Sequence, residues 1–180
     1  FRHPDVKGMP KFTGGLVGYF GYETIRYIEP KLAMTAEKTD PLKLPDILLM
    51  VSEQVIVFDN LSGKLYIIVH ARPNDKQAYP KAQARIDDLI KQMHQAIPKS
   101  GFTKSREVKE ADFISDFKQT GFETAVAKIK QYITDGDAMQ VVISQRMSIP
   151  FHAEPLDLYR SLRSLNPSPY MYYLDLGDFH

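Results

Sequence analysis

The chain has 180 residues, 43% hydrophobic and 25% charged, and its 23 lysines and arginines against 22 aspartates and glutamates leave a net charge of +1. This length suits one domain, or one domain and part of another, and so small a charge excludes nucleic-acid or membrane binding through bulk electrostatics. The absence of cysteine excludes disulfide scaffolds, cysteine-ligated zinc and thiol nucleophiles. We expect a cytoplasmic protein, because no apolar run approaches the ~20 residues that cross a bilayer and no leader opens the chain.

The first patterned stretch is TGGLVGYFGYE, residues 13–23, with glycine at positions 15, 18 and 21. This spacing matches neither the G-x-G-x-x-G of dinucleotide folds nor a P-loop, which argues against phosphate binding. We predict a strand, or a strand leading into a helix, in which glycine lets another backbone come close.

Residues 23–28, ETIRYI, are predicted to form a short helix that Pro30 ends, and the proline-containing residues 31–46 a surface loop. Two apolar runs follow, DILLMVSEQVIVFD and KLYIIVHAR, on either side of NLSG. Apolar runs around a turn sequence predict a β-hairpin.

Apolar side chains at steps of three and four predict an amphipathic helix over residues 77–97: Ala78, Ala82, Ile86, Leu89, Ile90, Met93 and Ile97. The charged segment 98–112, PKSGFTKSREVKEAD, is the predicted boundary between two subregions. We place the division between residues 110 and 111.

Two more helices are predicted in the second subregion. Thr120 and Glu123 have the spacing of a capping box, and the helix that follows them continues until the DGD of residues 135–137. Pro155 suits the first position of another helix, which Asn166 and Pro167 end. With a further strand at residues 170–176, YMYYLDL, the chain is predicted to be α+β, with large mostly antiparallel sheets and helices packed outside.

Residues 136–151, GDAMQVVISQRMSIPF, read as a strand whose two faces differ. One face is apolar apart from Gln145, whereas the other carries Gln140, Ser144, Arg146 and Ser148, because successive strand side chains point to opposite sides. The polar face either lies in water or lines a cavity. In a cavity, Arg146 would bind a carboxylate and Gln140 would position a small polar reactant.

No metal site is predicted within the chain. The five histidines, at positions 3, 70, 94, 152 and 180, lack metal-ligand spacing. Asp135 and Asp137 flank Gly136, and a turn between helix and strand explains them better than a metal pair.

Three stretches, YITDGDAMQVVISQRMSIPF, LYRSLRSLNPSPYMYYLDL and GGLVGYFGYE, together resemble the chorismate-utilising enzymes, and among them the anthranilate synthase component I family. The resemblance runs across most of the chain and implies part of that fold. It implies a lyase that converts chorismate and ammonia to anthranilate and pyruvate, the first step of tryptophan biosynthesis. It also implies Mg²⁺ as cofactor, a glutamine amidotransferase subunit as the ammonia-supplying partner, and L-tryptophan as feedback inhibitor.

The resemblance assigns a catalytic position to Gln140. Family members that form isochorismate or salicylate carry a lysine there, which acts as the base that activates water. Ammonia is already a nucleophile, so a neutral glutamine, which cannot take up a proton as an amine can, suits an enzyme that adds ammonia. The alternative for Gln140 is a purely structural hydrogen bond.

The segment NPSPYM, residues 166–171, resembles the segment with which the family holds tryptophan. It implies Asn166, Pro169, Tyr170 and Met171 as the regulatory site. Two prolines fix the backbone, and an aromatic ring and a thioether can pack against an indole. Without the resemblance, a helix stop followed by a buried strand is the preferred interpretation.

Several family motifs have no match in residues 1–180. They are a leucine-rich motif ending in Glu-Ser, a Gly-Thr that clamps chorismate, the paired magnesium-binding glutamates, and a later tyrosine and arginine. We therefore expect residues 1–110 to be part of a regulatory subregion, residues 111–180 the start of a chorismate-binding subregion, and this piece alone to be inactive. The alternatives are aminodeoxychorismate synthase component I of folate synthesis and a non-catalytic tryptophan-binding module.

Overall fold

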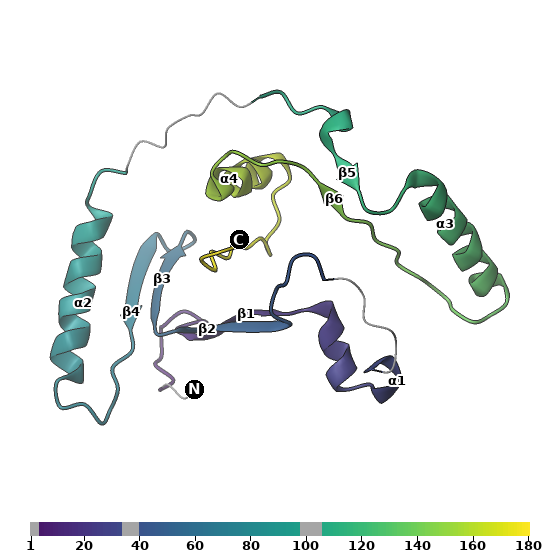
Figure 1. Ribbon diagram of the computed structural model, residues 1–180. Coiled ribbons are helices and arrows are strands. Elements are labelled where there is room, and N and C mark those ends of the chain that lie inside the picture. The colour runs from purple at the N-terminus through teal and green to yellow at the C-terminus, as the bar shows by residue number, and fades with distance from the viewer. Residues whose placement is uncertain (1–3, 34–39, 98–105) are drawn as a thin grey trace. The chain divides into compact units, whose positions relative to one another are not determined.

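The computed structural model describes residues 4–33, 40–97 and 106–180. The chain forms two units, residues 1–98 and 99–180, and both contain helices and antiparallel strands (Figure 1). The α+β class expected from the sequence is confirmed, and within the described residues the strands form three two-stranded antiparallel sheets. No helix of the described part has both the length and the apolarity needed to cross a bilayer.

Two antiparallel strand pairs make up the sheets of the first unit. Strand β1 (Gly15–Phe20) pairs with β2 (Ile47–Ser52), and β3 (Gln54–Asp59) pairs with β4 (Lys64–Val69). The predicted hairpin around NLSG is confirmed as β3 and β4. The longer apolar run before it forms two strands, because Glu53 separates β2 from β3 and each strand finds a different partner.

A helix packs on the second sheet, as Figure 1 shows for α2 (Ala78–Met93) beside β4. Side chains of β2 and β3 alternate between exposed and half-buried, the pattern of strands with one covered face. The buried hydrophobic side chain of the described residues is Ile68 of β4, which is 9% exposed. Arg85 of α2 also donates from Nε to Gln54 Oε1 over 2.9 Å, which ties the helix to β3.

The glycine prediction is confirmed at Gly18, which lies opposite Leu49 in the β1–β2 register. A Cβ at this position would collide with the carbonyl oxygen of Leu48. The strand therefore needs glycine because the neighbouring backbone occupies the space of a side chain.

Two short helices follow β1. The predicted helix at residues 23–28 is the 3₁₀ helix η1 (Tyr22–Tyr27). Pro30, expected to end a helix, instead begins α1 (Pro30–Ala33), because a proline fits the first helical turn, where its missing N–H has no partner to lose. The predicted loop 31–46 is irregular over residues 40–46, and its residues 34–39 lie outside the described part.

The second unit contains η2 (Glu110–Asp112), β5 (Ile114–Ser115), α3 (Gln119–Thr134), β6 (Met147–Ser148) and α4 (Pro155–Leu165). Strands β5 and β6 are antiparallel. Helix α4 begins at Pro155 and is capped at its end by Asn166, as the sequence predicts. Residues 98–105 of the predicted boundary segment lie outside the described part.

The predicted capping box at Thr120 is wrong. The backbone N–H of Phe122 donates to Lys118 O over 3.0 Å, so Lys118 is the N-cap residue and Thr120 lies within α3. Glu123 instead accepts a hydrogen bond of 2.8 Å from Gln119 Nε2. The pattern failed because the N-cap residue, Lys118, lies two positions before the threonine.

Two predicted strands are also mostly absent. Of residues 136–151, only Met147–Ser148 is strand, and residues 170–176 contain none. A strand needs a neighbour to share its backbone hydrogen bonds, and β5 offers only Ile114 and Ser115 as partners. Alternating side chains are therefore not sufficient to form these strands in the described residues.

Candidate functional site

The segment that carries Gln140 begins at the turn after α3. Asp135 caps the helix, Gly136 adopts φ +83°, and the N–H of Asp137 donates to Tyr132 O over 2.9 Å. A left-handed residue of this kind favours glycine. The turn predicted for Asp135 and Asp137 is confirmed, and it sends the chain back toward β6.

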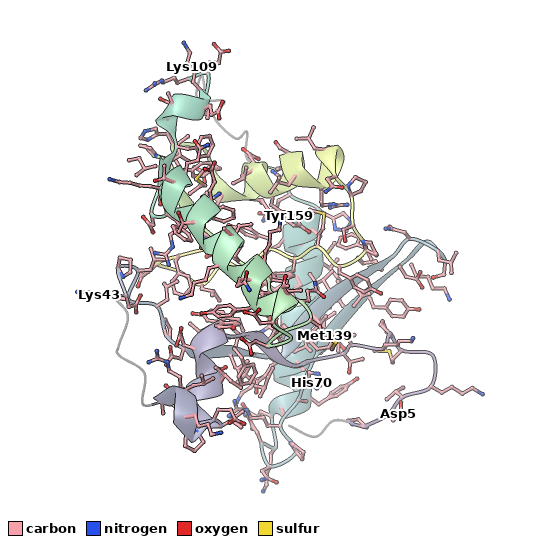
Figure 2. The ribbon with its side chains drawn as sticks, turned by 90° about the vertical axis from the view of Figure 1, so that its right-hand side faces the viewer. Asp5, Lys43, His70, Lys109, Met139 and Tyr159 are labelled. Carbon is pink, nitrogen blue, oxygen red and sulfur yellow. The ribbon has the colours of Figure 1, made fainter. Side chains whose placement is uncertain are left out.

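Gln140 itself is exposed and lies in residues 138–146, which form neither helix nor strand. Its neighbour Met139 is 98% exposed and lies just beyond α3 (Figure 2). Gln140 does not line the cavity beside β5 and β6 that is described below. Its catalytic role stays a prediction.

The residues between β5 and β6, which include α3, form one excursion of the chain. The two ends of this excursion meet where β5 and β6 pair. The N–H of Asp116 donates to Arg146 O over 3.2 Å, and Asp116 Oδ2 lies 3.7 Å from Arg146 Nη1. Ser115 Oγ lies 3.2 Å from Gln145 Oε1. We call Ser115, Asp116, Gln145 and Arg146 the junction cluster.

The junction cluster was missed by sequence reasoning except for Arg146, which was considered as a carboxylate ligand. The residues that meet here are about thirty positions apart in the chain, as for Ser115 and Gln145. Neither a motif nor a periodicity connects them. Only the antiparallel pairing of Ser115 with Met147 brings them together.

The predicted tryptophan segment follows α4 directly. The N–H of Asn166 donates to Leu162 O over 2.9 Å. The amide side chain of Asn166 is exposed, beyond the end of the helix. Pro169 and Tyr170 form a turn, with Tyr170 87% exposed and Met171 half-buried. The four residues are thus close along the chain, and their role in tryptophan binding stays a prediction.

Aromatic contacts link α4 to the residues that follow this segment. The ring of Tyr159 lies 5.8 Å from that of Tyr173, and Tyr173 stacks on His180 (Figure 2 labels Tyr159 on α4). Desolvation, followed by the negative charges of Asp175 and Glu154, raises the pKa of Tyr173 above its ordinary value. The Tyr173 hydroxyl lies 3.0 Å from His180 Nδ1, within hydrogen-bond distance.

A cavity of about 750 Å³ lies beside β5 and β6. Apolar side chains such as Ile114, Ile149 and Phe151 contribute much of its wall, and Arg106 forms an ion pair of 2.7 Å with Asp112 at its lining. None of the predicted site residues lines this cavity. Its surface suits apolar contact more than the binding of a doubly charged substrate.

The described residues do not provide a metal centre. No group of three or more histidine, aspartate or glutamate side chains converges within residues 4–33, 40–97 and 106–180. His70 and His94 bind backbone carbonyl oxygens, His152 lines the cavity, and His3 lies outside the described part. The donor set needed for Mg²⁺ is therefore not met by these residues.

Comparison with known proteins gives a consistent result. The sequence profile of the chorismate binding enzymes matches residues 2–180. The chain is 52% identical over its whole length to anthranilate synthase component 1 of Pseudomonas aeruginosa and 41% identical over 93% of its length to that of Aquifex aeolicus. It spans 37% and 34% of the length of those two proteins.

A solved structure shares the fold. The crystal structure of anthranilate synthase component I from Streptococcus pneumoniae superposes with a TM-score of 0.78 at 27% identity. The match covers 97% of this chain and 39% of that one. Similarity of sequence and of structure thus extends over nearly all of residues 1–180.

Proposed function

Because this chain belongs to the family of chorismate binding enzymes, we propose that it is part of the component I subunit of an anthranilate synthase. The observation that carries the proposal is the 52% identity to a protein of that name across the whole chain. The subunit would add ammonia to the ring of chorismate with loss of the hydroxyl group, and then eliminate pyruvate to leave anthranilate. It would act in the cytoplasm, in tryptophan biosynthesis.

Gln140 is proposed to face the incoming nucleophile. Its Oε1 can accept a hydrogen bond from ammonia, and its Nε2 can donate one, but neither removes a proton from water at neutral pH. The side chain would hold ammonia near the ring without generating hydroxide. In this chain the exposure of Gln140 leaves the amide available for such a contact.

Mg²⁺, when bound, would neutralise a carboxylate of the substrate. Since the described residues lack the donor set for it, we assign no ligand in this chain and route no step through the ion. The ammonia would come from a separate glutamine amidotransferase subunit. Residues 1–180 alone are proposed to be inactive.

The test uses the full-length subunit with chorismate, magnesium and an ammonium salt. We expect the fluorescence of anthranilate to rise with time, and chromatography to show anthranilate and not aminodeoxychorismate. Aminodeoxychorismate as the product would instead place the protein in folate synthesis. Addition of the amidotransferase should let glutamine replace ammonium.

A variant separates the role of Gln140 from the rest of the proposal. Gln140→Lys introduces a side chain that can act as a base toward water. We expect the ammonium-dependent rate to fall ~100-fold, within the range that one positioned catalytic group supplies. Isochorismate formation without ammonium would support the assignment, and an unchanged ammonium-dependent rate would remove Gln140 from the site.

A further inference from the structure

The residues between β5 and β6 form one excursion that leaves and returns at the junction cluster. Helix α3 of 16 residues leads outward after Ser115, and residues 138–146 lead back to Met147. Within the described residues, the paired part of the two strands is Ile114 with Ser148 and Ser115 with Met147. So short a ladder gives the excursion little backbone pairing at its base.

The junction cluster extends that pairing by side-chain and backbone contacts. Asp116 holds Arg146 twice, by its N–H on the carbonyl at 3.2 Å and by Oδ2 near Nη1 at 3.7 Å. Ser115 Oγ accepts from the N–H of Phe117 at 3.2 Å and lies 2.9 Å from Phe117 O. These contacts fix the direction in which the chain enters α3 and the direction from which it returns.

The direction of this segment affects the position of Gln140, because several residues separate Gln140 from the junction cluster. Gln140 and Arg146 are six positions apart, which is at most ~20 Å of extended chain. A rotation of ~10° at the junction cluster would then move Gln140 by up to ~3.5 Å, whereas a catalytic group has to be held within ~0.5 Å. A weak contact at the base of the excursion therefore has a large effect at Gln140.

We propose that Arg146, held by Asp116 in the junction cluster, is a positioning residue that sets the placement of Gln140 toward ammonia. The inference rests on the proposed function, because the proposed function is what assigns Gln140 to face ammonia. It differs from the earlier possibility that Arg146 binds a substrate carboxylate, since its guanidinium faces a carboxylate of this same chain. The side chains of the pair are 48% and 59% exposed, so the pair contributes little to overall stability.

The experiment measures steady-state kinetics and thermal unfolding of the full-length subunit with single and paired substitutions. Arg146→Gln and Asp116→Asn should each raise the KM for ammonium ~3- to 5-fold, the factor that an exposed ion pair supplies. The KM for chorismate should stay within about twofold of wild type, and Tm within ~2 °C, because the pair is exposed. The exchange Asp116→Arg with Arg146→Asp should recover most of the ammonium KM.

The matched control is Arg160→Gln in α4, which breaks an exposed arginine–aspartate pair of 3.0 Å with Asp157 in the same unit. It should leave both KM values unchanged. If Arg146→Gln fails to fold, the more conservative Asp116→Asn and Arg146→Lys carry the test. A raised ammonium KM in Asp116→Asn that is absent in Arg146→Lys supports the proposal.

Two results would overturn it. An unchanged ammonium KM in the folded variants means that the pair does not position Gln140. A rise in the chorismate KM at least as large as the rise for ammonium means that Arg146 contacts the substrate itself. Failure of the proposed function is distinct from both, because the wild-type subunit would then form no anthranilate.

Discussion

His70, labelled in Figure 2, reaches back across the first unit to Thr13, where its Nε2 donates a hydrogen bond of 2.7 Å to the backbone carbonyl. The two residues are 57 positions apart. Thr13 precedes β1 and His70 follows β4, so the contact joins the two strand pairs of this unit. The imidazole lies over Gly14, which separates Thr13 from β1.

The first prediction concerns Gly14. Its φ is +150°, and a Cβ would stand 2.5 Å from His70 Nε2 and 2.7 Å from Ser52 O. We expect Gly14→Ala to lower the free energy of unfolding by ~2–3 kcal/mol through backbone strain and displacement of the imidazole. Urea unfolding measures the loss.

Gly8→Ala is the matched control, because Gly8 also has positive φ, +89°, but has open space around the added methyl group. It should cost only ~1 kcal/mol for the left-handed backbone. Equal losses at the two glycines would show that the His70 contact adds nothing.

The second prediction concerns the β1–β2 pair. Gly18→Ala would place a methyl group against the carbonyl of Leu48, and we expect a loss of ~1–3 kcal/mol from overpacking. Leu16→Ala on the same strand removes a side chain that is 56% exposed and should change stability by less than ~1 kcal/mol. A Gly18→Ala protein as stable as wild type would contradict the observed register.

The third prediction is a pH dependence at the turn between β3 and β4. The hydroxyl of Ser62, its backbone N–H and that of Leu61 donate to Asp59, and these bonds lower the pKa of the Asp59 carboxyl. A lowered folded-state pKa gives stability that is present above the unfolded value and is lost as the pH falls through the folded value. Ser62→Ala should therefore raise the Asp59 pKa and reduce stability at pH 7 more than at pH 2.

Carboxyl chemical shifts followed by NMR against pH test this prediction. Asp75 is an internal control, since Lys81 and the N–H of Gln77 lower its pKa independently of Ser62. Its titration should be the same in wild type and in Ser62→Ala. An Asp59 titration unmoved by the substitution would show that the Ser62 hydroxyl does not lower the pKa, and would leave the backbone N–H groups and the charge of Lys64 as its causes.

The fourth prediction concerns feedback inhibition of the full-length enzyme. Met171 is half-buried in the segment proposed to hold tryptophan, and Met171→Ala would remove much of its apolar contact. We expect the tryptophan concentration for half-inhibition to rise ~10-fold, which corresponds to ~1.4 kcal/mol. Tyr172→Ala, at a residue that is 78% exposed, is the control and should leave inhibition unchanged. Unaltered inhibition in Met171→Ala would exclude this side chain from the regulatory site.

The sequence predicted those elements whose signals are local. The β3–β4 hairpin depends on a turn between two apolar runs, α2 on a repeat of three and four residues, and the start of α4 on Pro155. Each of these elements depends on interactions within one segment or with the adjoining segment, so its signal is visible in the spacing of nearby residues. The resemblance to the chorismate-utilising enzymes likewise follows from contiguous motifs.

The tertiary structure decided what depends on distant partners. Residues 136–151 alternate like a strand, yet only Met147 and Ser148 pair, because backbone hydrogen bonds require a neighbour that the local pattern does not specify. The contacts of Asp116 with Arg146 and of His70 with Thr13 join residues far apart in the chain. The sequence thus determines which segments can form regular structure, and the packing of distant segments determines which of them do. The reason is that one strand supplies only the donor or the acceptor of each interstrand hydrogen bond, and a distant strand has to supply the other.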